Sequence, residues 1–361
     1  MRDTEKLIQA AINSSIFPGA VLMVSLKGRV VFHKAFGRAD IFTGTAMTTQ
    51  TFFDLASLTK PLATTLAVMR LVQEGQLDLD QPIVEILPVL DGSGKEKITT
   101  RYLLAHTSGL PHWRPWFIRL RHYPPAERRA VLRRLLIAEP LEAQPGEITV
   151  YSDLGFMLLA WIIEEISAQR LDYFVNSAVY NPLGIEDLFY LDRRSVSVPA
   201  DQFAATQLCP WRRRLLKGQV DDDNTWAAGG IGGQAGLFGT AIEVGVLAET
   251  LRLTAAGVET SDLFTARTVN RFFKKQVSGR ALGFDVPTRP DSSTGQFFAD
   301  NSVGHLGHTG TSFWIDPDKS LVVVLLTNRV HPFRFSTGIL PFRPALHDTV
   351  VRELGLAPTT A

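Results

Sequence analysis

The sequence predicts an α/β (α+β) protein in which helices flank an antiparallel sheet built from both ends of the chain, with an all-helical lobe inserted between them. Two observations lead to this prediction. Strand patterns lie near the two ends, as an apolar hairpin over residues 19–36 and a continuous apolar run over residues 321–328. Helical periodicity fills most of the chain between them.

The chain is long enough for one large domain with a sizeable core. Its 361 residues are 45% apolar and 20% charged, which is typical of a folded globular protein. We expect one domain over residues 1–361, with an α/β lobe from about residues 1–56 and 240–361. A mainly helical lobe would take up about residues 57–239, since no low-complexity linker divides the chain.

Each strand and helix is predicted from a local pattern. The hairpin places two apolar strands, residues 20–24 and 30–33, around a turn at Lys27-Gly28-Arg29. The run at 321–328 predicts a central strand that is buried on both faces. The remaining segments have apolar residues at spacings of three and four, which predict helices at residues 7–16, 57–74, 100–104, 154–166, 241–251 and 347–354. Beyond Pro358 we expect the chain end to fray.

Composition argues against several classes of protein. The formal net charge is +1, so no global electrostatic field favours nucleic acid. The single cysteine, Cys209, rules out an intrachain disulfide and a cysteine-rich metal site. No run reaches the ~18 apolar residues of a membrane-spanning helix, and the first apolar residues form a helical stripe rather than a signal sequence. We therefore expect a cytoplasmic protein without stable membrane insertion, or a periplasmic one if a leader has been removed.

The stretch from Phe53 to Pro61 has a pattern suited to nucleophilic catalysis. A strand-like approach runs into Ser57, and a helix follows at once. If the helix begins near Ser57, the side chains of Ser57 and Lys60 stand three residues apart on one face. A lysine amine can take the proton of a serine hydroxyl when burial or nearby charge lowers its pKa from about 10.4. Ser-x-x-Lys also occurs by chance, so this interpretation depends on the rest of the chain.

Three other features carry polar or flexible residues. Tyr151 stands just before the long apolar helix, where a phenol could relay protons or could simply pair its hydroxyl. His106 could be a base, but we expect a structural histidine that ties its loop. The glycine-rich stretch 227–236 lacks the Gly-Lys-Ser/Thr ending of a phosphate loop, so we expect its backbone to pass close to other backbone or to substrate.

Three stretches follow one another along the chain: Ser57-x-x-Lys60, Tyr151-Ser152-Asp153 and His308-Thr309-Gly310. Their order resembles that of the penicillin-recognising serine hydrolases, whose elements include Ser-x-x-Lys and Lys-Thr-Gly. The chain resembles the branch of class C β-lactamases, D-alanyl-D-alanine carboxypeptidases and related esterases. In that branch the second element is Tyr-x-Asn, and the third is Lys-Thr-Gly or His-x-Gly. The resemblance covers nearly the whole chain, from about Phe17 to Leu354.

The resemblance implies a role for each matching position. Ser57 would be the acylated nucleophile and Lys60 its proton partner, while Tyr151 would assist proton transfer. Which of Lys60 and Tyr151 is the base stays open. The backbone N–H groups of Ser57 and Thr311 would form the oxyanion hole. The expected substrate-binding residues are Asp153, Thr309, Gly310 and Thr311.

Two positions depart from the family pattern. Asp153 replaces the usual asparagine, and an ionised Asp153 near Lys60 would raise the pKa of the amine, which favours Tyr151 as the base. His308 replaces the third-element lysine, although it could still donate a hydrogen bond or act as an acid. A histidine with a pKa near ~6.5 is mostly neutral at pH 7, so it binds a substrate carboxylate less well than a permanent cation does. The second change weakens a β-lactamase prediction and favours substrates without an obligatory carboxylate.

We expect a cofactor-free serine hydrolase that forms an acyl-enzyme on Ser57 and cleaves an ester or an amide, such as a peptide derived from peptidoglycan. Weak or incidental β-lactamase turnover is a second hypothesis. A third is a non-catalytic protein that binds a ligand in the same cleft, because Asp153 and His308 depart from the family pattern. A metal site is disfavoured, since His305 and His308 lack a third ligand at a readable spacing. The expected partner is a small-molecule ester or peptide substrate and not nucleic acid.

Overall fold

Both ends of the chain build one six-stranded antiparallel sheet in the computed structural model, which describes residues 1–192, 198–258 and 262–358. Its strands, in the spatial order β3-β2-β1-β11-β10-β9, are β1 (Gly19–Leu26), β2 (Arg29–Asp40), β3 (Thr45–Ala46), β9 (Val303–Leu306), β10 (Ser312–Asp316) and β11 (Leu321–Thr327). The hairpin and the central apolar strand are thus confirmed. The predicted fraying falls on residues 359–361, which lie outside the described part of the chain.

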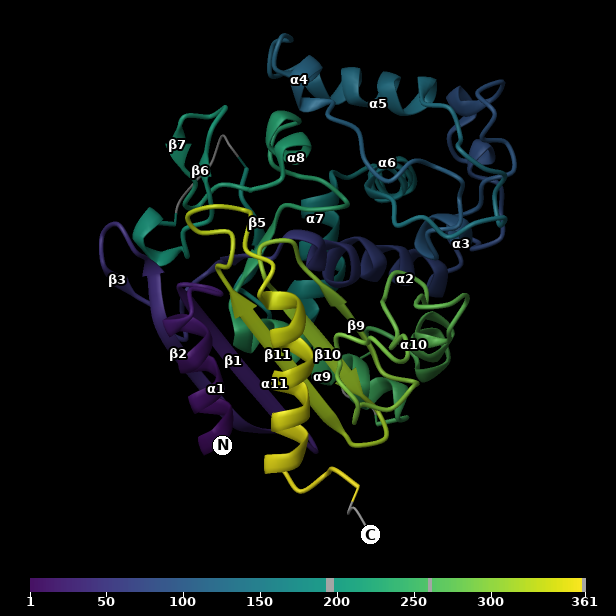
Figure 1. Ribbon diagram of the computed structural model, residues 1–361. Coiled ribbons are helices and arrows are strands. Elements are labelled where there is room, and N and C mark those ends of the chain that lie inside the picture. Colours follow the sequence, from purple (N-terminus) through teal and green to yellow (C-terminus); the bar gives the residue numbers. More distant parts are fainter. Residues whose placement is uncertain (193–197, 259–261, 359–361) are drawn as a thin grey trace.

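Helices cover both faces of this sheet (Figure 1). They are α1 (Arg2–Asn13), α9 (Ala241–Ala255) and α11 (Ile339–Glu353). α1 and α11 pack together on one face, and α9 packs on the other against β1, β10 and β11. Side chains of β1 alternate between two cores: Leu22 and Val24 lie on the side of α1 and α11, and Val21 and Met23 lie on the side of α9. Burial on both faces explains why β1 and β11 read as unbroken apolar runs.

The middle of the chain is mainly helical but also carries short strands, of which the sequence pattern predicts only β4, the strand-like approach to Ser57. Its helices are α2 (Leu66–Gln73), α3 (Thr100–Leu104), α4 (Phe117–Leu120), α5 (Arg128–Ala138), α6 (Asp153–Ser167), α7 (Leu171–Val175) and α8 (Asp223–Ala227), with α10 (Ala266–Phe273) following α9. The short strands are β4 (Phe53–Asp54), β5 (Leu188–Tyr190), β6 (Leu208–Cys209), β7 (Arg214–Leu215) and β8 (Leu237–Gly239). β4, β8 and β5 form a small sheet, and β6 pairs with β7. β4 ends just before Ser57 and so connects this small sheet to the segment that carries Ser57 and Lys60.

The most apolar of the long helices, α6, is a core element. Leu154, Phe156, Leu158, Leu159 and Ile162 on this helix are all fully buried. Ser152 caps the helix by accepting the Gly155 N–H, which fixes where it begins. In the described ranges, no helix combines the length and apolarity needed to cross a bilayer.

Two predicted helices differ from the structure. The segment that begins near Ser57 is not one α-helix, because a 3-10 turn (Ala56–Leu58) and a π-helix (Lys60–Thr65) precede α2. The last helix, α11, begins at Ile339 rather than near His347. Pro341 and Pro344 obscure this start in the sequence. Pro341 lies in the first turn, where a proline is tolerated, and Pro344 lies inside the helix.

Candidate active site

Ser57 lies in a tight turn that the buried carboxyl group of Asp54 holds in place. The residue before it, Ala56, has a left-handed backbone with φ of 49°, which is costly for a residue with a Cβ. The Asp54 Oδ1 atom accepts the Ala56 N–H at 2.8 Å, and Oδ2 accepts the Asp221 N–H at 2.6 Å. Burial, together with the charges of Asp221 and Asp222, raises the pKa of Asp54 to about 7. The buried Asp54 carboxyl group therefore links the strained Ser57 turn to the backbone of Asp221 and holds the turn in place.

Lys60 is fully buried and lies beside the Ser57 hydroxyl. Its Nζ atom donates to Ser57 Oγ at 3.2 Å and to the backbone carbonyl oxygen of Gln234 at 3.0 Å. It also forms an ion pair with Asp153 Oδ1 at 2.7 Å. Within this pair only the Asp153 side chain is partly exposed to solvent. The Ser-x-x-Lys spacing thus brings the hydroxyl and the amine together, as the sequence predicts.

The surroundings of Lys60 decide its protonation. Burial by itself would lower the pKa of the amine, but the Asp153 carboxylate and the Tyr151 phenol outweigh burial and raise the pKa above its usual value. The predicted effect of Asp153 is confirmed in direction. At neutral pH Lys60 is therefore an ammonium ion that cannot take a proton until it has lost one.

Tyr151 completes this group from the segment just before α6. The Lys60 Nζ atom lies 4.8 Å from the centroid of the Tyr151 ring. The Tyr151 carbonyl oxygen contacts His112 Nδ1 at 2.6 Å, which anchors the backbone. Ser57 and Tyr151 line the same cavity. One alcohol, one amine and one phenol, scattered along the sequence, thus meet in one place.

His106 supports this segment from behind. Its Nδ1 atom accepts the Ser152 N–H at 2.9 Å, and its ring lies 4.5 Å from the Tyr151 ring between centroids. Burial and the nearby cations Arg280 and Lys60 hold the pKa of His106 well below its usual value, so the ring is neutral. The expected structural role of His106 is confirmed.

The glycine-rich stretch brings backbone close to the site. The carbonyl oxygens of Gly233 and Gln234 accept hydrogen bonds from Thr64 Oγ1 at 2.7 Å and from Lys60 Nζ at 3.0 Å. A Cβ on Gly233 would overlap the Phe156 carbonyl oxygen in α6. The predicted close approach of backbone to backbone is thus confirmed.

A cavity of about 400 Å³ opens over Ser57 at the edge of the main sheet. Its wall is formed by residues from the Ser57 turn, Tyr151, the segment 280–285, the end of β9, the segment after β11 and the start of α11. The polar and glycine residues on this wall include Ser57, Tyr151, Arg280, Asp285, His305, Gly307, His308, Arg329 and Arg343. Within the described ranges, no group of three or more His, Cys, Asp or Glu side chains is arranged to hold a metal ion.

The structure places the predicted third element differently from expectation. Thr309 and Thr311 are buried, and their hydroxyls donate to the backbone carbonyl oxygens of Asp54 at 2.7 Å and Leu55 at 3.0 Å. Gly310 has φ of 102° and turns the chain back toward β10. These three residues are not among those that line the cavity over Ser57, and their contact with substrate stays a prediction. The two threonine hydroxyls brace the turn that carries Ser57.

His308 lies at the cavity wall with an arginine beside it. Arg329 Nη2 lies 3.4 Å from His308 Nδ1. Part of the His308 side chain reaches solvent, yet the protein packed around its ring lowers the pKa. Arg329 and Arg334 act in the same direction, while Asp221 and Asp153 act against them. His308 is therefore neutral at pH 7, as the sequence predicts, but a permanent cation stands next to it.

The comparisons with known proteins agree with this geometry. The protein-family description named Beta-lactamase matches residues 4–341 of the chain. The chain belongs to the β-lactamase family. A Salmonella agona protein, provisionally named a D-alanyl-D-alanine carboxypeptidase, is 30% identical over 391 aligned residues, which cover 94% of this chain and 88% of the relative. The fold class and the resemblance predicted from the motifs are thus confirmed.

Solved structures of similar fold include several kinds of enzyme and homologue. EstCE1, described as a hydrolase with promiscuous acyltransferase activity, superposes with a TM-score of 0.74 at 24% identity, covering 96% of this chain and 98% of its own. An octameric penicillin-binding protein homologue from Pyrococcus abyssi has a TM-score of 0.74 at 21% identity, covering 99% of this chain and 78% of its own. Simvastatin synthase from Aspergillus terreus has a TM-score of 0.73 at 20% identity, covering 98% and 96%. These likenesses show a shared fold.

Within this β-lactamase family chain, sequence reasoning missed His305. It lies on β9, is buried, and lines the cavity, with its ring centroid 6.0 Å from that of Tyr151. Burial and the nearby cations Lys60 and Arg280 hold its pKa well below its usual value. His305-Leu306-Gly307 also fits the His-x-Gly form of the third element, three residues before His308-Thr309-Gly310. Its place at the end of a strand could have identified it.

Sequence reasoning also missed the arginines of this β-lactamase-family site, because they lie far apart in the chain. Arg329 is held by its hydrogen bond to the Ser336 carbonyl oxygen at 2.6 Å. Arg343 in α11 is buried and donates to the Thr311 carbonyl oxygen at 2.9 Å. Burial, with repulsion from Arg329, lowers the pKa of Arg343 to about 9, which still leaves it charged at neutral pH. No short motif contains these residues.

Proposed function

We propose that this protein is a serine hydrolase that forms an acyl-enzyme on Ser57 and cleaves peptides or esters, with peptides that end in a free carboxylate as preferred substrates. The observation that carries the proposal is the buried contact of Lys60 Nζ with Ser57 Oγ beside Tyr151. A serine in this setting can be activated by its neighbours, which is the general requirement for nucleophilic catalysis. The provisional name of the Salmonella agona relative supports a carboxypeptidase-type reaction.

The proposed first step is attack of Ser57 Oγ on the scissile carbonyl carbon. Because Lys60 is held as an ammonium ion by Asp153, we assign the role of proton acceptor to Tyr151 as phenolate, with Lys60 stabilising its negative charge. The proton then passes to the leaving amine or alkoxide. Water attacks the resulting ester in the second half of the reaction, which releases the acid and restores the serine.

For the oxyanion hole we propose the backbone N–H groups of Ser57 and His308. Both residues line the cavity, one in the 3-10 turn and the other just after β9. The earlier expectation used Thr311, which lies behind the wall. A donor of this kind is worth roughly 10²–10³ in rate.

The preference for a carboxylate follows from the arginines. The sequence suggests that this chain lacks a permanent cation near the third element, yet Arg329 lies beside His308 on the cavity wall. Arginine binds carboxylates strongly and stays charged at all relevant pH values. We expect Arg329→Gln to raise KM for a D-alanyl-D-alanine dipeptide about tenfold or more, while a neutral p-nitrophenyl ester shows little change.

A fluorescent penicillin or a fluorophosphonate tests the central proposal. We expect covalent labelling at Ser57 that disappears in Ser57→Ala, and hydrolysis of p-nitrophenyl esters, nitrocefin or D-alanyl dipeptides that disappears with it. Nitrocefin turnover much faster than turnover of the dipeptides would favour a β-lactamase. An unreactive Ser57 in folded protein would overturn the hydrolase proposal.

One observation favours a second candidate, a non-catalytic binding protein. The Lys60–Asp153 ion pair leaves the amine charged and paired, which is a poor arrangement for a lysine base. If Tyr151 does not act, the cavity would bind ligands without turnover. Tight binding of a D-alanyl dipeptide to wild-type protein, with no labelling and no turnover, would support this alternative.

A further inference from the structure

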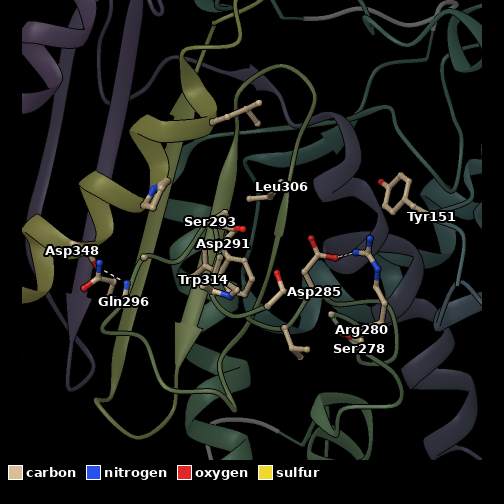
Figure 2. A pocket seen from close by; sticks show the side chains of 18 of the residues that line it. Tyr151, Ser278, Arg280, Asp285, Asp291, Ser293, Gln296, Leu306, Trp314 and Asp348 are labelled. Atoms are coloured by element: carbon tan, nitrogen blue, oxygen red, sulfur yellow. Dashed lines mark hydrogen bonds and ion pairs between the residues drawn. The ribbon is translucent and has the colours of Figure 1, made fainter.

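A second cavity, of about 790 Å³, adjoins the one over Ser57. The two cavities share Tyr151, Arg280, Asp285, Leu306 and Leu340 on their walls, so a ligand can extend from one into the other. Figure 2 shows Tyr151 at one end of the second cavity and Asp348 with Gln296 at the other. The Arg280–Asp285 ion pair lies between Tyr151 and the indole of Trp314 in this view.

The charge of the wall changes sign between the two cavities. Over Ser57, three guanidinium groups face one carboxylate; the charged residues there are Arg280, Arg329, Arg343 and Asp285. In the second cavity, three carboxylates face one guanidinium among the described lining residues; these are Asp285, Asp291, Asp348 and Arg280. The Arg280–Asp285 pair belongs to both walls and neutralises itself. The remaining charge is therefore positive near Ser57 and negative away from it.

Asp348 shows that the second cavity has an unused acceptor. Its side chain is 8% exposed and lines the cavity from α11. Asp348 Oδ1 accepts the Gln296 N–H at 2.7 Å, while Oδ2 has no partner among the described residues. Oδ2 is not among the buried atoms that lack a partner, so this oxygen is open to the cavity. A ligand cation can therefore reach it there.

Neither of two nearby basic side chains, His347 and Arg289, pairs with the free oxygen of Asp348. His347 contacts the Ser293 carbonyl oxygen through Nδ1 at 2.8 Å, and burial lowers its pKa to about 4, so it is neutral. Arg289 is engaged with the carbonyl oxygens of Gly295 and Phe298 and does not line the cavity. The negative charge of this wall is thus left for a ligand.

We propose that the second cavity is a subsite for an ammonium group on the acyl part of the substrate. This inference rests on the proposed function and narrows its substrate class to dipolar peptides, with a carboxylate on the leaving group and an amine on the acyl group. The carboxylate lies toward Arg329 and the amine toward Asp291 and Asp348. A substrate bound in the reverse direction would meet like charge at both ends.

The test compares two peptides that differ by one charge. They are Nα-acetyl-L-lysyl-D-alanyl-D-alanine, which keeps its side-chain ammonium, and the same peptide acetylated on both amines. We expect kcat/KM to be about tenfold or more higher for the charged peptide, which is the size of one hydrogen-bonded charge contact. In the double variant Asp291→Asn, Asp348→Asn, this ratio should fall toward one. Asn keeps an acceptor for the Gln296 N–H, which protects folding.

Controls separate this subsite from the proposed function. Asp91→Asn changes an exposed acid that lines neither cavity and should keep the preference. Labelling of Ser57 by fluorescent penicillin reports the hydrolase itself. If Ser57 proves unreactive, calorimetric binding of both peptides to Ser57→Ala measures the same preference without turnover. A ratio near one in the wild type, or an undiminished ratio in the folded double variant, would overturn the subsite.

Discussion

Several segments form the wall of the cavity over Ser57, and two of them contribute in opposite ways. The segment 54–60 contributes reactive side chains, since Ser57 lines the cavity and its Oγ atom lies 3.2 Å from Nζ of the buried Lys60. The segment 305–311 presents His305, Gly307 and His308 to the cavity and keeps Thr309 and Thr311 behind it. The hydroxyls of those two threonines hold the first segment through the Asp54 and Leu55 carbonyl oxygens.

The difference shows that two equally recognisable motifs can serve different purposes. In the first, residue type matters because the reacting atoms belong to side chains. The second segment mainly holds other groups in position. Its threonines fix the turn that carries Ser57, and the turn after β9 carries the His308 N–H proposed for the oxyanion hole. Substitutions in the two segments should therefore differ in which quantity they change. Lys60→Met, Gly307→Ala and Thr311→Val test this difference, and Asp153→Asn tests the surroundings of Lys60.

The largest effect is expected for Lys60→Met. Lys60 is proposed to stabilise the charge of the proton acceptor Tyr151, so losing the amine should impair proton transfer and lower the rate of acylation at least ~10²-fold. Stopped-flow labelling with a fluorescent penicillin measures the rate. Lys95→Met is the matched control, because Lys95 is also buried and also donates to a backbone carbonyl, that of Ile137. It should lose stability but keep its acylation rate, and a normal rate in Lys60→Met would refute the assignment.

The next effect tests the second segment through its backbone. In Gly307→Ala the new Cβ would overlap Thr311 Oγ1 and lie 2.8 Å from the Leu55 carbonyl oxygen. The segments should be pushed apart, with a loss of about 1–3 kcal/mol in unfolding free energy and about tenfold in kcat. Gly155→Ala, which meets only ordinary contacts of 3.6 Å or more, is the control. Urea unfolding and ester hydrolysis measure both, and equal behaviour of the two variants would contradict the comparison.

A change in pH dependence is expected for Asp153→Asn. Asp153 raises the pKa of Lys60, so removing the carboxylate lets burial lower that pKa. If Lys60 accepts the proton, activity rises as pH rises through its pKa, and the acidic limb of kcat/KM should move to lower pH. If Tyr151 accepts it, Asp153→Asn leaves Lys60 less charged and should reduce activity near neutral pH, while Tyr151→Phe abolishes it. The pH profiles of the two variants thus decide between the bases.

The smallest effect is expected for Thr311→Val. The change removes the hydrogen bond to the Leu55 carbonyl oxygen and keeps the shape, so it should cost about 1–2 kcal/mol in unfolding free energy. We expect kcat to fall severalfold and KM to stay nearly constant, because Thr311 braces the turn rather than contacting substrate. Thr349→Val, which removes a hydrogen bond on the outer part of α11, should stay within about 0.5 kcal/mol of the wild type. A large rise in KM for Thr311→Val would restore Thr311 to the substrate site.

Much of the fold was predictable because its signals are local. The apolar runs of β1 and β11, the cap before α3 and the periodicity of α6 each depend on neighbours in sequence. The short strands β5 to β8 were not predictable, since two or three residues carry no usable period. The start of α11 was obscured by prolines that its first turns accommodate.

The candidate site divides along the same line. From the sequence by itself, the spacing of Ser57 and Lys60 predicted their proximity, and the family resemblance predicted the roles of Tyr151 and Asp153 beside them. Only the tertiary structure decided that His305 faces the cavity and that Arg329 supplies the cation that His308 lacks. It also decided that a second cavity of opposite charge adjoins the first. The physical reason is that charge and shape in a cavity are set by residues brought together from distant segments, whose proximity leaves no pattern along the chain.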